Sequence, residues 1–266
     1  YKISTFIITD AGHFAGGEPL FDIKGNQIFK DALSLKGSQG LVIDPQKMAY
    51  DTRIDAVGKP TSDIVFIIGE SYNRHHSSLY GYTLPTCPQL AERNPYVFTD
   101  VISPKNFTFV AIRYLLSMEE ANDESLRNSQ LLCPIMKAAG YNVVFYSNQI
   151  VKSNNVNGFD MPMNLLFDNP IISKASFDYR NDKLFVRDGE FVDKFITDIP
   201  SFEKSDTANF TIIHLVGNHV HYPDRFPPSE AVFKPADVNR RELSETEKKL
   251  VTDYDNAILY NDKQVA

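Results

Sequence analysis

The stretch Asp63-Ile64-Val65-Phe66-Ile67-Ile68-Gly69-Glu70-Ser71 decides the fold class of this chain. An uninterrupted apolar run that ends in glycine is typical of a strand buried on both faces of a parallel sheet. A carboxylate that follows such a strand lies at the sheet edge where open α/β proteins place their ligands. The stretch therefore predicts an α/β fold with Glu70 at a candidate site, although a solvated loop carboxylate is the alternative interpretation of Glu70.

The rest of the chain alternates between strand and helix patterns. This alternation predicts a mostly parallel central sheet with helices on both faces. Residues 1–60 show weak periodicity and are predicted to be a lead-in segment, whereas 61–266 are predicted to form one α/β domain. Further strands are predicted at 96–102, 141–146 and 210–216. Helices are predicted at 27–35, from near Pro85, and at 106–117, 123–139 and 189–196. A last helix is predicted after the capping pair Ser244 and Glu247.

Composition excludes some classes of protein. The 266 residues carry 34 acidic and 27 basic side chains, for a net charge of −7, which argues against a nucleic-acid partner because such binding depends on Lys and Arg. No apolar run approaches the roughly 20 residues that span a bilayer. The two cysteines, Cys87 and Cys133, are predicted to be unpaired and buried, and a single disulfide remains the alternative.

Thr108 is the candidate nucleophile. It follows Ser103-Pro104-Lys105-Asn106-Phe107 and opens a predicted helix, where free backbone N–H groups favour a bound phosphate. A threonine hydroxyl needs a base or a metal to become nucleophilic, and Glu70 has the chemistry for either role, as a Zn²⁺ ligand or as an acid or base. The spacing alone favours the interpretation that Thr108 only caps the helix, and the nucleophile role depends on the resemblance to a known enzyme family.

Two further motifs follow predicted strands. Ser147-Asn148-Gln149 offers side-chain amides that can donate hydrogen bonds to phosphate oxygens, although an ordinary turn explains these residues equally well. In His214-Leu215-Val216-Gly217-Asn218-His219, the first histidine lies inside the apolar strand and is predicted to be a satisfied core residue. His219 lies beyond the strand end and is therefore predicted to reach the site.

The run from Ile68 to Tyr82 resembles the opening motif of a known enzyme family. Its Gly69-Glu70-Ser71, Arg74, His76 and Ser78-Leu79-Tyr80-Gly81-Tyr82 are similar to those of the phosphoethanolamine transferases, membrane-anchored enzymes of the alkaline phosphatase superfamily. The resemblance extends in several ordered motifs from Asp63 to the end of the chain. It implies an alkaline phosphatase-like fold, Zn²⁺ bound by Glu70 and Thr108, a covalent intermediate on Thr108, and substrate binding by Asn148, Gln149 and His219.

The same resemblance implies the substrates and the location. The expected donor is phosphatidylethanolamine, and the expected acceptor is lipid A or a core sugar. The expected location is the inner membrane, with the catalytic domain in the periplasm and an anchor before Tyr1. Alternatives are a phosphoglycerol transferase, a phosphodiesterase or a sulfatase-like hydrolase of the same superfamily, or a non-catalytic binding module, and the absence of a Cys-x-Pro-x-Arg motif counts against a sulfatase.

The chain departs from the family pattern in two places. The family's remaining zinc ligands lie in a Ser-Asp-His-Gly-Glu motif, and no Asp-His pair occurs in this sequence. The domain is therefore expected to lack its C-terminal part here and to be inactive alone. Lys105, Asn106 and Phe107 also replace the small residues and cysteines that many members have before the threonine, which leaves the acceptor open.

Overall fold

The computed structural model describes residues 44–50, 58–103, 108–119, 128–149, 167, 169–181, 184–204 and 206–266. Within them, the four strands of the central sheet are all parallel, in the order β1-β4-β2-β3. This confirms the predicted fold class. The strands are β1 (Ile64–Ile68), β2 (Asn142–Ser147), β3 (Tyr179–Arg180) and β4 (Asn209–His214).

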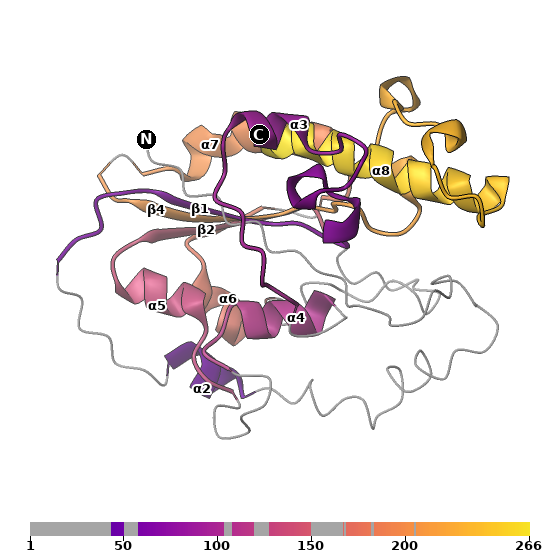
Figure 1. Cartoon of the computed structure of the whole chain (residues 1–266). Helices are drawn as coiled ribbons and strands as arrows, with labels where there is room; N and C mark the ends of the chain where they lie inside the picture. Colours follow the sequence, from indigo (N-terminus) through magenta and orange to yellow (C-terminus); the bar gives the residue numbers. More distant parts are fainter. Residues whose placement is uncertain are drawn as a thin grey trace.

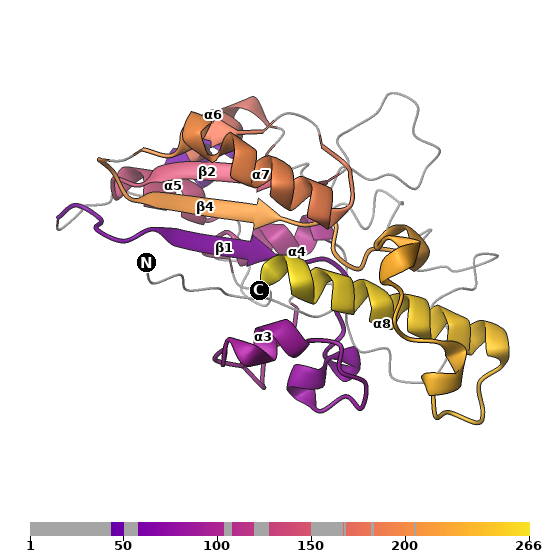
Figure 2. The same ribbon diagram turned by 90° about the horizontal axis from the view of Figure 1, so that it is seen from above.

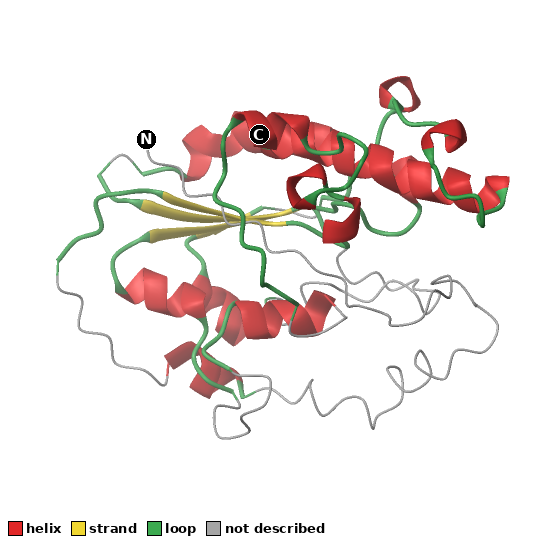
Figure 3. Ribbon diagram, in the orientation of Figure 1, coloured by secondary structure: helices red, strands yellow, loops and turns green. Residues whose placement is uncertain are grey.

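Helices cover both faces of the sheet, as Figures 1 and 3 show. One layer holds α3 (Pro88–Glu92), α7 (Asp188–Phe202) and α8 (Glu245–Val265). The view from above in Figure 2 shows α7 over the sheet, and α3 and α8 on the side of β1. The opposite layer holds α2 (Pro45–Tyr50), α4 (Thr108–Leu115), α5 (Leu132–Ala138) and α6 (Pro170–Ser176).

The strands feed two separate apolar layers because successive side chains of a strand point to opposite faces. Val143 and Phe145 of β2 pack into the core under α4, α5 and α6, whereas Val144 and Tyr146 pack against α7. All four side chains are completely buried. Burial on both faces explains why the strand sequences are continuously apolar instead of alternating.

The register brings the carboxyl ends of three strands to one level. Ile68 of β1 and Ser147 of β2 both lie beside His214 of β4. Backbone hydrogen bonds continue just beyond, from Leu215 N to Ile68 O (2.9 Å) and from Asn148 N to His214 O (2.8 Å). The residues that follow β1, β2 and β4 are therefore held at the same edge of the sheet.

The strand predicted at 96–102 is wrong. The segment is irregular and crosses between the helical layers (Figure 1), with Tyr96 85% and Ile102 74% exposed. Side chains, not a neighbouring strand, bind its carbonyls: the Tyr80 hydroxyl donates to Phe98 O and the Arg74 guanidinium to Thr99 O, each at 3.1 Å. Apolar residues alone did not make this segment a strand, because no sheet edge is paired with it.

Several helix boundaries also differ from the prediction. Of the helix expected over 123–139, residues 123–127 lie outside the described residues. Residues 128–131 are not helical, because a short antiparallel bridge uses their backbone: Met118 N donates to Gln130 O and Leu132 N to Leu116 O, and α5 then begins at Leu132. The helix expected at 189–196 continues to Phe202 and contains Pro200 in its last turn. The capping pair before α8 is confirmed. The helix predicted at 27–35 lies outside the described residues, and α2, α6 and β3 were not predicted.

Candidate functional site

Glu70 and Thr108 meet at the carboxyl edge of the sheet. The Thr108 hydroxyl lies 2.8 Å from both carboxylate oxygens of Glu70, although 38 positions separate the two residues in the chain. Glu70 follows β1 directly, and Thr108 is the first residue of α4. The end of a buried strand and the start of a helix therefore place a carboxylate and a hydroxyl in direct contact.

A close approach of two loops fixes the position of Glu70. Its carbonyl accepts the backbone N–H of Asn218 at 2.9 Å, and Gly217 packs against its backbone. A Cβ on Gly217 would lie 2.6 Å from the Glu70 nitrogen and 2.8 Å from its carbonyl oxygen, and Gly217 has a φ of +53°. Both the space and the left-handed backbone require glycine here.

His214 lies beneath this pair and differs from its prediction. It is completely buried, yet neither ring nitrogen has a hydrogen-bond partner among the described residues. Its Nε2 is 3.9 Å from the Glu70 carboxylate, too long for a hydrogen bond but close enough for ionic attraction. The prediction that His214 is a core residue is therefore confirmed, whereas the prediction that its polar groups are satisfied is wrong among the described residues. The sequence does not show that His214 lies near Glu70, because this follows from the strand register. The register pairs His214 with Ile68, two residues before Glu70.

The electrostatic surroundings favour an ionised Glu70. Burial raises the pKa of this carboxyl, but the interaction with His214, the hydrogen bond from Thr108 and the charge of His219 together lower it more. The net result is a pKa below the ordinary value of 4.5. His219 is half-buried, and its charge contributes to lowering the pKa of Glu70, while its substrate-binding role stays a prediction.

The structure gives Asn148 and Gln149 protein partners. Asn148 is buried and donates both amide hydrogens, to Val186 O and to the Asp188 carboxylate, each at 2.8 Å. Gln149 is also buried and donates to Leu215 O. A substrate phosphate would therefore have to compete with these bonds, and the substrate-binding role of both residues stays a prediction.

Asp188 is a structural residue of the site that the sequence did not suggest. It is 1% exposed, and its carboxylate accepts the backbone N–H groups of Val216 (3.0 Å) and Gly217 (2.8 Å) as well as the Asn148 amide. Asp188 is the first residue of α7. It thereby ties that helix to the turn after β4 that packs against Glu70.

The donor set fits part of a zinc site. A carboxylate, a threonine hydroxyl and an unpartnered buried imidazole are groups that bind Zn²⁺. Within the described ranges, however, no three His, Cys, Asp or Glu side chains are grouped to hold a metal ion. Glu70 and Thr108 would hold the ion beside His214, and further ligands would have to come from outside the described residues.

A parallel α/β sheet with a carboxylate and a hydroxyl in contact at its carboxyl edge has these groups where open α/β proteins bind their ligands. A family model described as "Sulfatase" matches residues 62–266, so the chain belongs to the sulfatase family. Among the described residues, no helix is both long and apolar enough to cross a membrane.

Individual relatives indicate which enzymes of this family the chain resembles: phosphoethanolamine transferases. The phosphoethanolamine transferase EptC of Escherichia coli K12 is 28% identical over 232 residues, which are 80% of this chain and 37% of that protein. The phosphoethanolamine transferase EptA of Helicobacter pylori is 29% identical over 207 residues, 76% of this chain and 37% of that protein. The chain thus spans little more than a third of the length of these relatives.

A solved structure confirms the alkaline phosphatase-like fold. The crystal structure of the C-terminal periplasmic domain of EptC from Escherichia coli, in complex with Zn, matches with a TM-score of 0.60 and 26% sequence identity. The match covers 78% of this chain and 58% of that domain. The expected resemblance to phosphoethanolamine transferases is therefore confirmed, and zinc is observed in that related domain.

Proposed function

We propose that this chain is part of the catalytic domain of a zinc-dependent phosphoethanolamine transferase. The observation that carries the proposal is the contact of the Thr108 hydroxyl with both oxygens of Glu70, 2.8 Å each. A nucleophile must touch the group that activates it, and a helix cap would not need a buried carboxylate across the site. The similarity to EptC and EptA supports phosphoethanolamine as the transferred group.

Thr108 performs the two chemical steps in turn. Its oxygen attacks the phosphorus of phosphatidylethanolamine, the bond from phosphorus to the diacylglycerol oxygen breaks, and the lipid product leaves with a proton. An acceptor hydroxyl or phosphate then attacks the phosphoethanolamine-threonine and releases Thr108. Because Thr108 opens α4, backbone N–H groups and the helix dipole favour the phosphate there.

Zn²⁺ held by Glu70 and Thr108 would supply positive charge that lowers the pKa of the hydroxyl and polarises the phosphate. The ionised state of Glu70 suits this role, since a ligand carboxyl must be deprotonated. His214 and His219 would lie beside Glu70, close to the transferred phosphate. Phosphoryl transfer depends mainly on such positioning and charge stabilisation.

The proposed partners and location follow from the relatives. The donor would be phosphatidylethanolamine and the acceptor lipid A or a core sugar of the cell envelope. The domain would lie in the periplasm, as the related EptC domain does, and an anchor outside this chain would hold it at the inner membrane.

The test replaces the hydroxyl. Thr108→Ala in the complete gene product, loaded with zinc and incubated with labelled phosphatidylethanolamine, should abolish transfer, with a loss of at least about 10⁴-fold for a removed nucleophile. Mass spectrometry of the peptide that contains residue 108 should show the phosphoethanolamine adduct in the wild type alone.

Thr108→Ser is the matched control, because it keeps a hydroxyl and should retain the adduct. Transfer by Thr108→Ala at the wild-type rate would contradict the assignment of the nucleophile. A glycerophosphate adduct formed from labelled phosphatidylglycerol would instead identify a phosphoglycerol transferase of the same family.

A further inference from the structure

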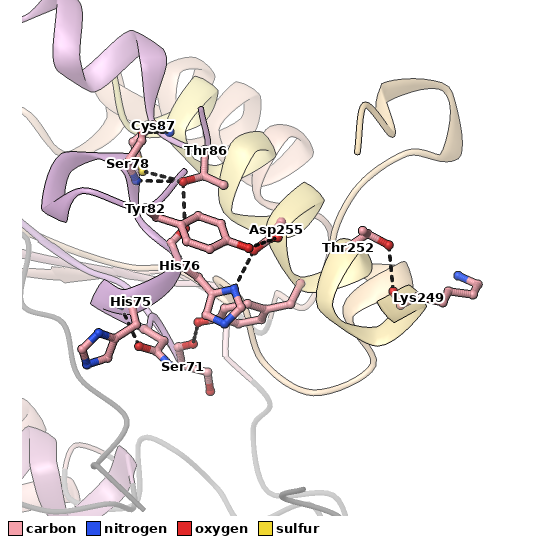
Figure 4. Close-up of polar contacts among 12 residues, drawn as sticks. Ser71, His75, His76, Ser78, Tyr82, Thr86, Cys87, Lys249, Thr252 and Asp255 are labelled. Atoms are coloured by element: carbon pink, nitrogen blue, oxygen red, sulfur yellow. Dashed lines mark hydrogen bonds and ion pairs between the residues drawn. The ribbon is translucent and has the colours of Figure 1, made fainter. Parts of the chain in front are cut away.

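A buried carboxylate beside the candidate site holds a histidine that the proposed chemistry has not used. Asp255 of α8 is completely buried, and its two oxygens bind His76 Nδ1 at 2.7 Å and the Tyr82 hydroxyl at 2.8 Å. Figure 4 shows the imidazole and the phenol converging on this carboxylate. Each oxygen of Asp255 is thus bound by a side chain of the loop that follows β1.

The contact with Asp255 fixes which imidazole nitrogen carries the proton. A carboxylate only accepts hydrogen bonds, so Nδ1 of His76 must be the donor. In the neutral ring, Nε2 is then the basic nitrogen, with a lone pair available. The described residues give Nε2 no hydrogen-bond partner, and the His76 side chain is 22% exposed.

Aromatic contacts hold the ring in this orientation. The imidazole centroid lies 4.9 Å from the ring of Tyr82 and 5.2 Å from the ring of Tyr254, the latter edge-on. A side chain fixed on two sides and by a short hydrogen bond loses little further entropy when it reacts, which is the geometry of a preorganised acid–base group.

Tyr254 and Ser71 link the histidine to the candidate site. The Tyr254 hydroxyl donates to the carbonyl of Ser71 at 2.6 Å, and the Ser71 hydroxyl donates to Glu70 at 3.3 Å. Tyr254 therefore contacts both His76 and the residue that follows the metal-binding carboxylate. Figure 4 shows Ser71 and His76 in the same neighbourhood.

We propose that His76 is the general base for the second half-reaction, with Asp255 and Tyr82 as positioning residues. The inference rests on the proposed function, because it needs a phosphoethanolamine-threonine at position 108. Nε2 takes the proton of the acceptor hydroxyl while the acceptor oxygen bonds to phosphorus. The bond from phosphorus to Thr108 Oγ breaks, its electron pair stays on Oγ, a proton from solvent restores the hydroxyl, and His76 releases the proton it took to solvent.

The test separates the two half-reactions. In the zinc-loaded complete gene product, His76→Gln should still form the Thr108 adduct from phosphatidylethanolamine at a rate within a few-fold of wild type. Its discharge to purified lipid A should slow by about 10²-fold or more, the usual contribution of a general base. The adduct should therefore accumulate, which a general loss of structure would not produce.

His75→Gln is the matched control, because His75 is the exposed neighbour on the same turn and His76 is the histidine that binds Asp255. It should form and discharge the adduct like the wild type. Equal discharge by His76→Gln and wild type would overturn the assignment of His76 alone. Failure of the wild type to form any adduct would overturn the proposed function and this inference with it.

A second measurement needs no catalysis. In the 266-residue chain, ¹⁵N NMR of the His76 imidazole should show the proton on Nδ1. Asp255→Asn offers an amide donor in place of one oxygen and should shift the proton toward Nε2, and the same substitution should slow adduct discharge. A proton found on Nε2 in the wild-type chain would contradict the proposed role.

Discussion

At the scale of single residues, the candidate site depends on several contacts that converge on Glu70. Glu70 is held by a backbone bond from Asn218, contacted by Thr108 and attracted by His214. The unpartnered nitrogens of His214 cost stability in the chain as described, since a buried polar group without a partner loses its hydration. Such a cost is typical of a functional site, where a ligand later supplies the missing partner.

Gly217→Ala tests the close approach at this scale. The left-handed backbone alone should lower the free energy of unfolding by about 1–2 kcal/mol. The new methyl group would also meet the Glu70 backbone at 2.6–2.8 Å, so the loss should be larger than that and zinc affinity should fall. Urea unfolding of the 266-residue chain and zinc titration of the complete gene product measure the two effects.

Gly81→Ala is the matched comparison for Gly217→Ala. Gly81 also has a positive φ, +91°, but nothing lies within 4 Å of its added Cβ. It should therefore show the backbone cost alone. Equal losses of stability at the two positions would mean that the contact between Gly217 and Glu70 does not constrain the site.

At the scale of elements, helices hold the loops that form the site. The first residue of α7 binds the turn after β4, and Asp255 of α8 binds the loop after β1. Asp262 of α8 also accepts the backbone N–H groups of Gln89 and Leu90 at the start of α3. Each link joins elements that are far apart in sequence, so helix packing and loop geometry are coupled.

Asp188→Asn tests the link between α7 and β4. Asparagine keeps one of the two oxygens as an acceptor and has an NH₂ group in place of the other. If that NH₂ group faces the backbone N–H of Gly217, two donors meet and the Gly217 N–H has no acceptor. Leaving a buried backbone donor unsatisfied costs about 1–3 kcal/mol. Burial raises the pKa of Asp188, so removal of its charge offsets part of this cost. We expect a net loss of stability in urea unfolding.

Asp193→Asn provides the comparison on the same helix, because Asp193 is exposed and its side chain makes no such link. Its substitution should leave the unfolding midpoint nearly unchanged. If Asp188→Asn behaves like Asp193→Asn, the turn after β4 is held by its own backbone and not by α7.

At the scale of the whole molecule, two apolar layers on one parallel sheet define the fold. The layer under α4, α5 and α6 contains Cys133, and the cluster between α8 and the loop after β1 contains Cys87. Both thiols are free and buried, which confirms the prediction from the sequence. They lie in different apolar clusters, so neither is placed to bridge to the other.

This separation predicts the behaviour of the thiols. The native chain should not react with a thiol reagent at pH 8, because burial excludes the reagent and raises the pKa of Cys133 to about 12, keeping it protonated. Denaturation without reductant should release two reactive thiols per chain. Fewer than two, measured by absorbance of the released reagent, would indicate a disulfide and contradict this packing.

The sequence by itself determined the class of fold and the position of Glu70 at the end of its first strand. The apolar run before Glu70 and the alternation of strands and helices were enough, because burial on both faces of a strand leaves a continuous local pattern. The capping pair of α8 was also readable, since it depends on residues three positions apart. Short segments such as β3 and α6 carried too little local pattern to be predicted.

Only the tertiary structure decided which polar groups share the site. That His214 lies under Glu70, that Asp188 holds the turn after β4 and that Asp255 orients His76 are consequences of strand register and helix packing. Residues 28 to 179 positions apart are joined by these contacts. Local pattern cannot encode such distances, because the partner of a buried polar group is chosen by the fold that surrounds it.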